Sequence, residues 1–216
     1  MILSLATWNI HKGFSQFNRR LVVHDLRERL RTLGADIVLL QEVQGLHLRH
    51  PKQHADWPEQ PQHHFLADEV WENHAYGPNV AYDHGHHGNA ILSRFCIASQ
   101  HNQDVTHFRF EGRGHLHCAI EVPGLALPVH CVSVHLSLFA GSRRKQLAAL
   151  VERIEAVVPA NAPLIIAGDF NDWKNHADAL LAQRLNLQEA FASNRGERPA
   201  RSFPARLPLL RLDRIY

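Results

Sequence analysis

The stretch PLIIAGDFN, residues 163–171, joins a short apolar run to two polar residues. Residues 164–167 have the length and composition of a buried strand and are bounded by Pro163 and Gly168. A strand fixes its own backbone, so Asp169 and Asn171 are delivered at a defined place. We therefore predict a buried strand over 163–168 that presents functional side chains at its C-terminal end.

The same pattern of an apolar run with a polar tip recurs along the chain. Strands are predicted over 2–10, over 36–43 (DIVLLQEV), over 89–94 (NAILSR), over 127–136 and over 210–216. Polar groups at the edge of a buried sheet cost stability unless they are satisfied. The set therefore needs one shared explanation, and its members are Asn9, Glu42, Asn89, His135, Asp169, Asn171 and Asp213.

Helical spacing of apolar residues predicts three helices between these strands. The first covers 22–33 and ends at Gly34, the second begins near Ser142 as its N-cap, and the third covers 176–185. Residues 116–122 and 127–136 form a predicted hairpin around Pro123-Gly124. Four prolines lie between residues 44 and 88, so we expect mostly loop there, with short elements near 65–71. Interspersed helices and consecutive strands indicate an α/β fold with mixed sheets.

The composition is that of an ordinary globular domain. The chain has 216 residues, 45% of them hydrophobic, and we expect a single domain over 1–216. A net charge of +2 gives little support to nucleic-acid binding. Three cysteines argue against a disulfide framework, and no apolar run is long enough to span a membrane. We expect a cytoplasmic monomer with no stable membrane insertion.

Histidine is frequent, with 18 copies, and many lie between residues 47 and 87. No pair has the HExxH spacing of a zinc helix, so the sequence predicts no zinc site there. We expect these histidines to lie in solvated loops.

The polar tips suit phosphate-ester chemistry. Carboxylate and amide oxygens favour Mg²⁺ (or Mn²⁺), which binds substrate phosphate. A histidine can transfer a proton or hydrogen-bond a phosphoryl oxygen. Each residue alone has a simpler explanation: Asn9 at a turn, Glu42 at a solvated strand end, His135 in the core, and Asp169 with Asn171 as a tight turn. Their coincidence in one order favours a shared site.

The motifs TWNI (7–10), LQEV (40–43), GNAILSR (88–94), VHL (134–136), GDFN (168–171) and LDRI (212–215) resemble, in order, those of the endonuclease/exonuclease/phosphatase superfamily. The resemblance implies a four-layer α/β sandwich of two packed mixed β-sheets flanked by helices. It is strongest to small stand-alone bacterial members, because NIHKG at 9–13 also matches theirs.

The resemblance also implies roles for individual residues. Glu42 resembles the metal-ligating glutamate, with Asn9 as its companion near the metal. Asp169 and Asn171 resemble the pair that orients water and phosphate. His135 resembles the histidine of the nuclease, sphingomyelinase and phosphatase branches, and Asn89 lies where substrate phosphate is bound. Asp213 resembles the aspartate that pairs with a terminal catalytic histidine.

Two departures from the family pattern leave alternatives open. His11 stands where abasic-site enzymes carry an aspartate. The sequence ends at Tyr216, before the family's Ser-Asp-His segment and its strand, so we interpret the domain as truncated at its C-terminus. The main hypothesis is a metal-dependent phosphoesterase acting on nucleic acid or on a small or lipid phosphodiester. The alternative is a catalytically impaired relic or a binding module.

Overall fold

Two β-sheets form the centre of the computed structural model, which describes residues 2–15, 18–191, 201–204 and 207–216. The first sheet has the order β1-β2-β4-β3 and the second the order β5-β6-β7-β8-β9. The strands of the first sheet are β1 (Leu5–Asn9), β2 (Ile37–His47), β3 (Asn73–Tyr82) and β4 (Gly85–Ser93). Those of the second are β5 (Cys96–Asp104), β6 (Gly114–Glu121), β7 (Val129–His135), β8 (Leu164–Asp169) and β9 (Asp213–Ile215).

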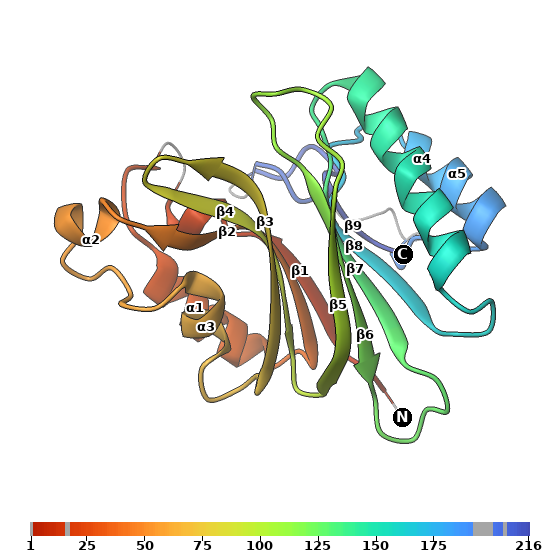
Figure 1. Cartoon of the computed structure of the whole chain (residues 1–216), viewed down its shortest axis with the longest axis horizontal. Helices are drawn as coiled ribbons and strands as arrows, with labels where there is room; N and C mark the ends of the chain where they lie inside the picture. Colours follow the sequence, from red (N-terminus) through yellow and green to blue (C-terminus); the bar gives the residue numbers. More distant parts are fainter. Residues whose placement is uncertain (1, 16–17, 192–200, 205–206) are drawn as a thin grey trace.

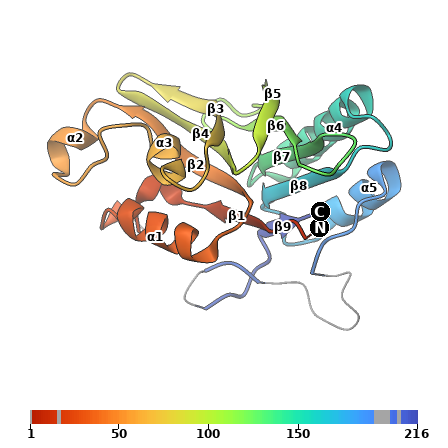
Figure 2. The same cartoon turned by 90° about the horizontal axis from the view of Figure 1, so that it is seen from below.

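Helices flank the pair of sheets on both sides. Helices α1 (Val23–Leu33) and α3 (Gln62–Ala67) lie on one side of the molecule, and α4 (Ala140–Val157) and α5 (His176–Leu185) on the other (Figures 1 and 2). Two short elements, η1 (His11–Gly13) and α2 (His50–Gln53), lie in the connections. Within the described ranges, no helix combines the length and apolar character that crossing a membrane requires.

Strict alternation along the central strands divides the interior into three layers. In β2, Val38 and Leu40 pack with α1 and α3, whereas Ile37 and Leu39 face the second sheet. In β7, Val132 and Val134 pack beneath α4 and α5, and Cys131 faces the first sheet. A period of two with both faces buried is why these strands are almost continuously apolar. The predicted four-layer sandwich is therefore confirmed.

Most predicted elements are present with small changes in their bounds. Helix α1 ends at Gly34, whose φ of 63° gives the left-handed termination that a glycine permits. The hairpin of β6 and β7 is antiparallel. Helix α5 spans the predicted 176–185. Ser142 is not an N-cap, because α4 begins at Ala140 after an extended Phe139 that makes no side-chain capping bond.

The prediction of a mostly looped segment at 44–88 was wrong. Strand β2 continues to His47, and β3 and β4 add a long antiparallel pair. Pro78 is tolerated because β3 lies at the edge of its sheet, and the register shifts there, between Pro78 and Val80. Strand β5 was missed altogether, since most of its residues are polar and exposed and give no apolar signal.

Candidate active site

The register of neighbouring strands brings the predicted polar tips together. Strands β7 and β8 run parallel and pair His135 with Asp169. Strand β9 runs antiparallel to β8 and pairs Asp213 with the same Asp169. In the first sheet, Asn9 at the end of β1 pairs with Gln41, which precedes Glu42. The first sheet thus contributes Glu42, from within β2, and the second contributes Asp169 and Asp213, at the ends of β8 and β9.

Asn9 connects the carboxylates of the two sheets. Its Nδ2 donates to Glu42 Oε1 at 3.2 Å and to Asp169 Oδ2 at 3.2 Å. Its Oδ1 accepts the backbone N–H of His11 at 3.1 Å, which fixes the amide. One side chain therefore holds an acidic group from each sheet, and this contact joins the two halves of the site.

Glu42 is an ionised carboxylate held by nearby donors. His11 Nδ1 lies 3.4 Å and Lys12 Nζ 3.5 Å from its Oε2. Burial alone would raise the pKa of Glu42, but the hydrogen bonds from His11 and Asn9 and the charge of Lys12 outweigh it and hold the pKa far below its usual range. Its backbone is left-handed, with φ of 53°, where the register of β2 against β4 shifts.

Asp169 has the opposite electrostatic character. Burial and the neighbouring Asp213 carboxylate raise the pKa of Asp169 to about 7, although it accepts hydrogen bonds from Asn9 and from the Asn171 backbone at 3.0 Å. Burial also raises the pKa of Asp213, and its Oδ1 is buried without a hydrogen-bond partner. Two carboxyl groups with raised pKa values, the buried Asp169 and the half-buried Asp213, therefore lie side by side.

His135 completes the group as a neutral imidazole. Its Nε2 lies 3.7 Å from Asp169 Oδ2. Burial lowers the pKa of His135 to about 3, and the charge of Arg113 adds to this effect. The ring can therefore donate one N–H while remaining uncharged at neutral pH.

Two cations of this site were not identified from the sequence. Arg113 is largely buried, donates to Glu111 Oε1 at 2.9 Å and to the Leu136 carbonyl at 3.3 Å, and interacts electrostatically with Glu42 and Asp169. Lys12 is the other. Lys12 is part of the NIHKG motif at 9–13, which was a usable signal, whereas Arg113 lies in a loop between strands and has no pattern around it.

The backbone of the GDFN motif explains its residue types. Gly168 has φ of 145°, and a Cβ there would lie 1.9 Å from the Val134 carbonyl oxygen. Asn171 has φ of 48°, in the left-handed region that asparagine tolerates best among non-glycine residues. Its Nδ2 donates to the Leu136 carbonyl at 2.9 Å, so β8 and the chain after β7 are locked together at the site.

Asn89 has a different environment from the other predicted residues. It is fully buried between the sheets, and its Nδ2 donates to the carbonyls of Gly114 at 2.9 Å and Ser133 at 3.2 Å. Both N–H groups of the amide are therefore used within the fold. The geometry gives Asn89 a bridging position between β4 and the second sheet.

The donor set fits a hard divalent cation. Glu42, Asp169 and Asp213 supply carboxylate oxygens, the type of ligand that Mg²⁺ and Mn²⁺ prefer. The unpartnered Oδ1 of Asp213 and the raised pKa values of both aspartates are what an uncompensated cluster of acids produces. These residues could hold a metal ion.

The fold and this group of residues define a class of protein, and comparison with known proteins identifies the family. Residues 6–216 match the Endonuclease/Exonuclease/phosphatase family, to which the chain belongs. The protein YbhP of Escherichia coli strain K12 is 48% identical over 212 residues, which cover 98% of this chain and 83% of YbhP.

Solved structures agree on the fold. A family protein from Leptotrichia buccalis matches with a TM-score of 0.73 at 16% identity, covering 99% of this chain and 86% of that one. The human Nocturnin catalytic domain with a bound sulfate anion matches with a TM-score of 0.72 at 19% identity, covering 99% and 80%. Members of this family are phosphoesterase hydrolases, so the resemblance seen in the sequence is confirmed at the level of family and fold.

Proposed function

We propose that this protein is a divalent-metal-dependent phosphoesterase that hydrolyses a phosphodiester bond at the site around Asp169. The observation that carries the proposal is the double hydrogen bond of Asn9, which brings Glu42 and Asp169 from different sheets into one buried site. His135 and Asp213 flank Asp169 through the strand register. A metal-binding carboxylate, a proton acceptor and a hydrogen-bond donor are thereby within reach of one substrate group.

Glu42 would hold the Mg²⁺ (or Mn²⁺) ion, because its carboxylate is ionised and carboxylate oxygens are ligands that these ions prefer. When bound, the ion neutralises charge on a phosphoryl oxygen. Asn9 turns its N–H groups toward the carboxylates and its oxygen toward the His11 backbone. We therefore assign Asn9 to holding Glu42 and Asp169 in position.

Asp169 would accept the proton of the attacking water. Its position against His135 and Asp213 keeps it buried, and a carboxyl group whose pKa lies near neutrality suits a general base. His135 and Asn171 would hydrogen-bond the phosphoryl oxygens as negative charge develops on them. Arg113 would add positive charge on the same side.

The test compares Asp169→Asn with the wild-type protein on bis(4-nitrophenyl) phosphate and on single-stranded DNA, with Mg²⁺ added after EDTA treatment. We expect turnover to fall by about 10²–10⁴-fold, the usual contribution of a positioned proton acceptor. The control is Asp83→Asn in the exposed turn between β3 and β4, which should leave turnover unchanged. Melting curves must show that both variants fold.

Near-normal turnover by Asp169→Asn would remove Asp169 from the mechanism. A wild-type protein that binds Mg²⁺ and a phosphodiester without cleaving it would support the alternative of a binding module. Where cleavage is seen, added salt identifies the substrate class. A steep loss on DNA, with cleavage of the small diester unaffected, points to nucleic acid.

A further inference from the structure

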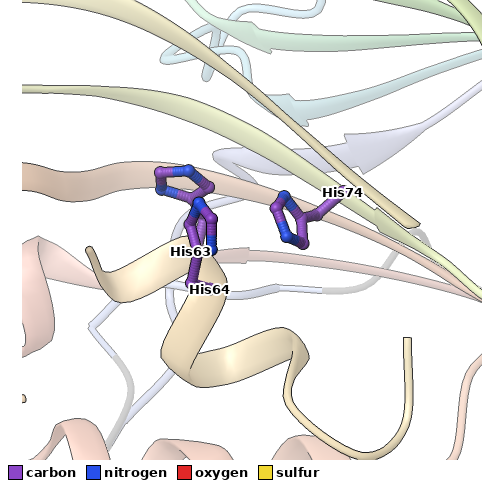
Figure 3. Close-up of side chains that lie close together, drawn as sticks. All are labelled: His63, His64 and His74. Atoms are coloured by element: carbon purple, nitrogen blue, oxygen red, sulfur yellow. The ribbon is translucent and has the colours of Figure 1, made fainter. Parts of the chain in front are cut away.

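Three histidines meet on the outer side of the first sheet, and we call them the histidine cluster. His63 and His64 come from α3 and His74 from β3, with their rings gathered in one place (Figure 3). One possible ligand atom from each histidine lies within 4.8 Å of those of the other two. Among the described residues, these three side chains are close enough together to hold a metal ion. The ring centroids of His64 and His74 are 4.3 Å apart.

The His63 side chain has a ring nitrogen that makes no hydrogen bond. Its side chain is buried, and its Nδ1 has no hydrogen-bond partner. The ring stacks on Tyr76 with centroids 4.6 Å apart and planes 8° from parallel, and the Tyr76 hydroxyl is itself tied to His86 at 2.9 Å. A buried ring nitrogen without a partner costs free energy unless something binds it.

Two of the three imidazoles, those of His63 and His74, are available as neutral ligands. Burial lowers the pKa of His63 to about 3 and also lowers the pKa of His74. A metal displaces no proton from a neutral imidazole, so binding at neutral pH has no protonation penalty. The rings repel one another only when protonated.

We propose that His63, His64 and His74 bind a divalent transition-metal ion of the Zn²⁺ type, with a fourth position open to water. Zn–N bonds of about 2.0–2.1 Å place tetrahedral ligand nitrogens roughly 3.3 Å apart. The three ligand atoms now lie within 4.8 Å of one another, so the site must close by up to about 1.5 Å to bind an ion. Three imidazoles without a carboxylate select Zn²⁺, Ni²⁺ or Cu²⁺ over Mg²⁺.

A bound ion would fasten α3 to β3. The first residue of α3, Gln62, donates to the Lys12 carbonyl at 2.8 Å and accepts the Gln44 N–H at 2.9 Å. Lys12 in turn lies 3.5 Å from Glu42 of the candidate active site. The histidine cluster is thus a second metal site, chemically distinct from the carboxylate site, on a helix that supports the Lys12 loop.

The test is calorimetric titration of the metal-stripped full chain with ZnCl₂ in excess Mg²⁺, which competes for carboxylate ligands. We expect one tight zinc equivalent. His64→Ala and His74→Ala should each weaken it by more than about 100-fold, since loss of even an outer-shell partner costs about 10–100-fold. His101→Ala, an exposed histidine on β5, is the matched control and should leave zinc binding unchanged.

Two further variants separate this site from its competitors. His84→Ala removes a ring from the other group of packed histidines, around His47, and Glu42→Gln disables the carboxylate site. Retention of the tight equivalent in both supports the proposal. Its loss in either one, with His64→Ala and His74→Ala unaffected, overturns the proposal, as does the absence of a tight equivalent in the wild-type chain. A zinc-induced rise in melting temperature should follow the same pattern across the variants.

Discussion

The candidate active site and the histidine cluster are both groups of polar side chains, yet they are built in opposite ways. At the candidate site, Asn9, Asp169 and Asn171 are fixed by hydrogen bonds to one another and to the backbone. In the histidine cluster, rings contact rings, and His63 Nδ1 has no partner. The first group is preorganised by strands, whereas the second is assembled by packing a short helix against an edge strand.

This difference explains which neighbouring side chains can be predicted from a sequence. Residues at the ends of paired strands are adjacent in space because strand register makes them so, as for His135 and Asp169. Residues of a helix and an edge strand meet only when the tertiary packing is known. The two regions should therefore respond differently to mutation.

The largest effect on stability should come from Gly168→Ala, a substitution near the end of β8. The new Cβ would lie 1.9 Å from the Val134 carbonyl oxygen, at a φ of 145°. Overpacking and backbone strain each cost about 1–3 kcal/mol, so we expect the free energy of unfolding to fall by roughly 3–5 kcal/mol. Urea denaturation measures the change.

The matched control for this substitution is Gly141→Ala in α4. A Cβ there meets nothing within 4 Å, and its φ is not in the left-handed region. Alanine at this first-turn position should raise the free energy of unfolding slightly, by at most about 1 kcal/mol. If Gly168→Ala were as mild as this control, the rigid strand end would be the wrong description of the site.

Much of the fold and of the candidate site could be predicted from the sequence, because buried strands are recognisable as short apolar runs bounded by turn residues. DIVLLQEV and PLIIAGDFN predicted β2 and β8, although β2 continues past Glu42 to His47, and Gly34 and the hairpin followed from local turn chemistry. That Asp169 would lie beside Glu42 could not be derived from either strand alone. It depends on Asn9 spanning the two sheets, and the family resemblance supplied that order.

The remaining features were missed for physical reasons. Strand β5 is an exposed edge and has no apolar period to detect. Pro78 looked like a loop signal, but an edge strand with a register shift accommodates it. The spacing of His63, His64 and His74 belongs to no single helix or strand, so a search for HExxH passes over it. Arg113 is placed by the fold alone.

An intermediate effect on stability should come from the titration of His115. This histidine is buried but belongs neither to the candidate active site nor to the histidine cluster. Neither ring nitrogen has a hydrogen-bond partner, and burial lowers its pKa to about 3. A depressed folded-state pKa means that the unfolded chain binds the proton first. Stability is therefore full above pH 6.5 and is lost as the pH falls towards 3, at roughly 1.4 kcal/mol per pH unit.

The variant His115→Leu isolates this contribution. It removes two unsatisfied nitrogens and the titration, so the unfolding free energy at pH 7 should change little. Between pH 6.5 and pH 5 it should lose roughly 2 kcal/mol less than the wild-type chain. Denaturation at several pH values measures both slopes. Equal slopes would show that His115 is hydrated or paired in solution.

The smallest effect on stability should come from His64→Ala in metal-free protein. Repeating the measurement with zinc distinguishes a metal ligand from a packing residue. His64 is exposed on α3, and alanine has the better helix propensity, so the free energy of unfolding should shift by less than about 0.5 kcal/mol. With zinc at 100 times its dissociation constant, the wild-type chain should gain about 2.7 kcal/mol, most of which the variant should lose. A residue that matters only with metal present is a ligand. A residue whose removal costs the same with and without zinc contributes packing, and that result would place the histidine cluster among ordinary ring contacts.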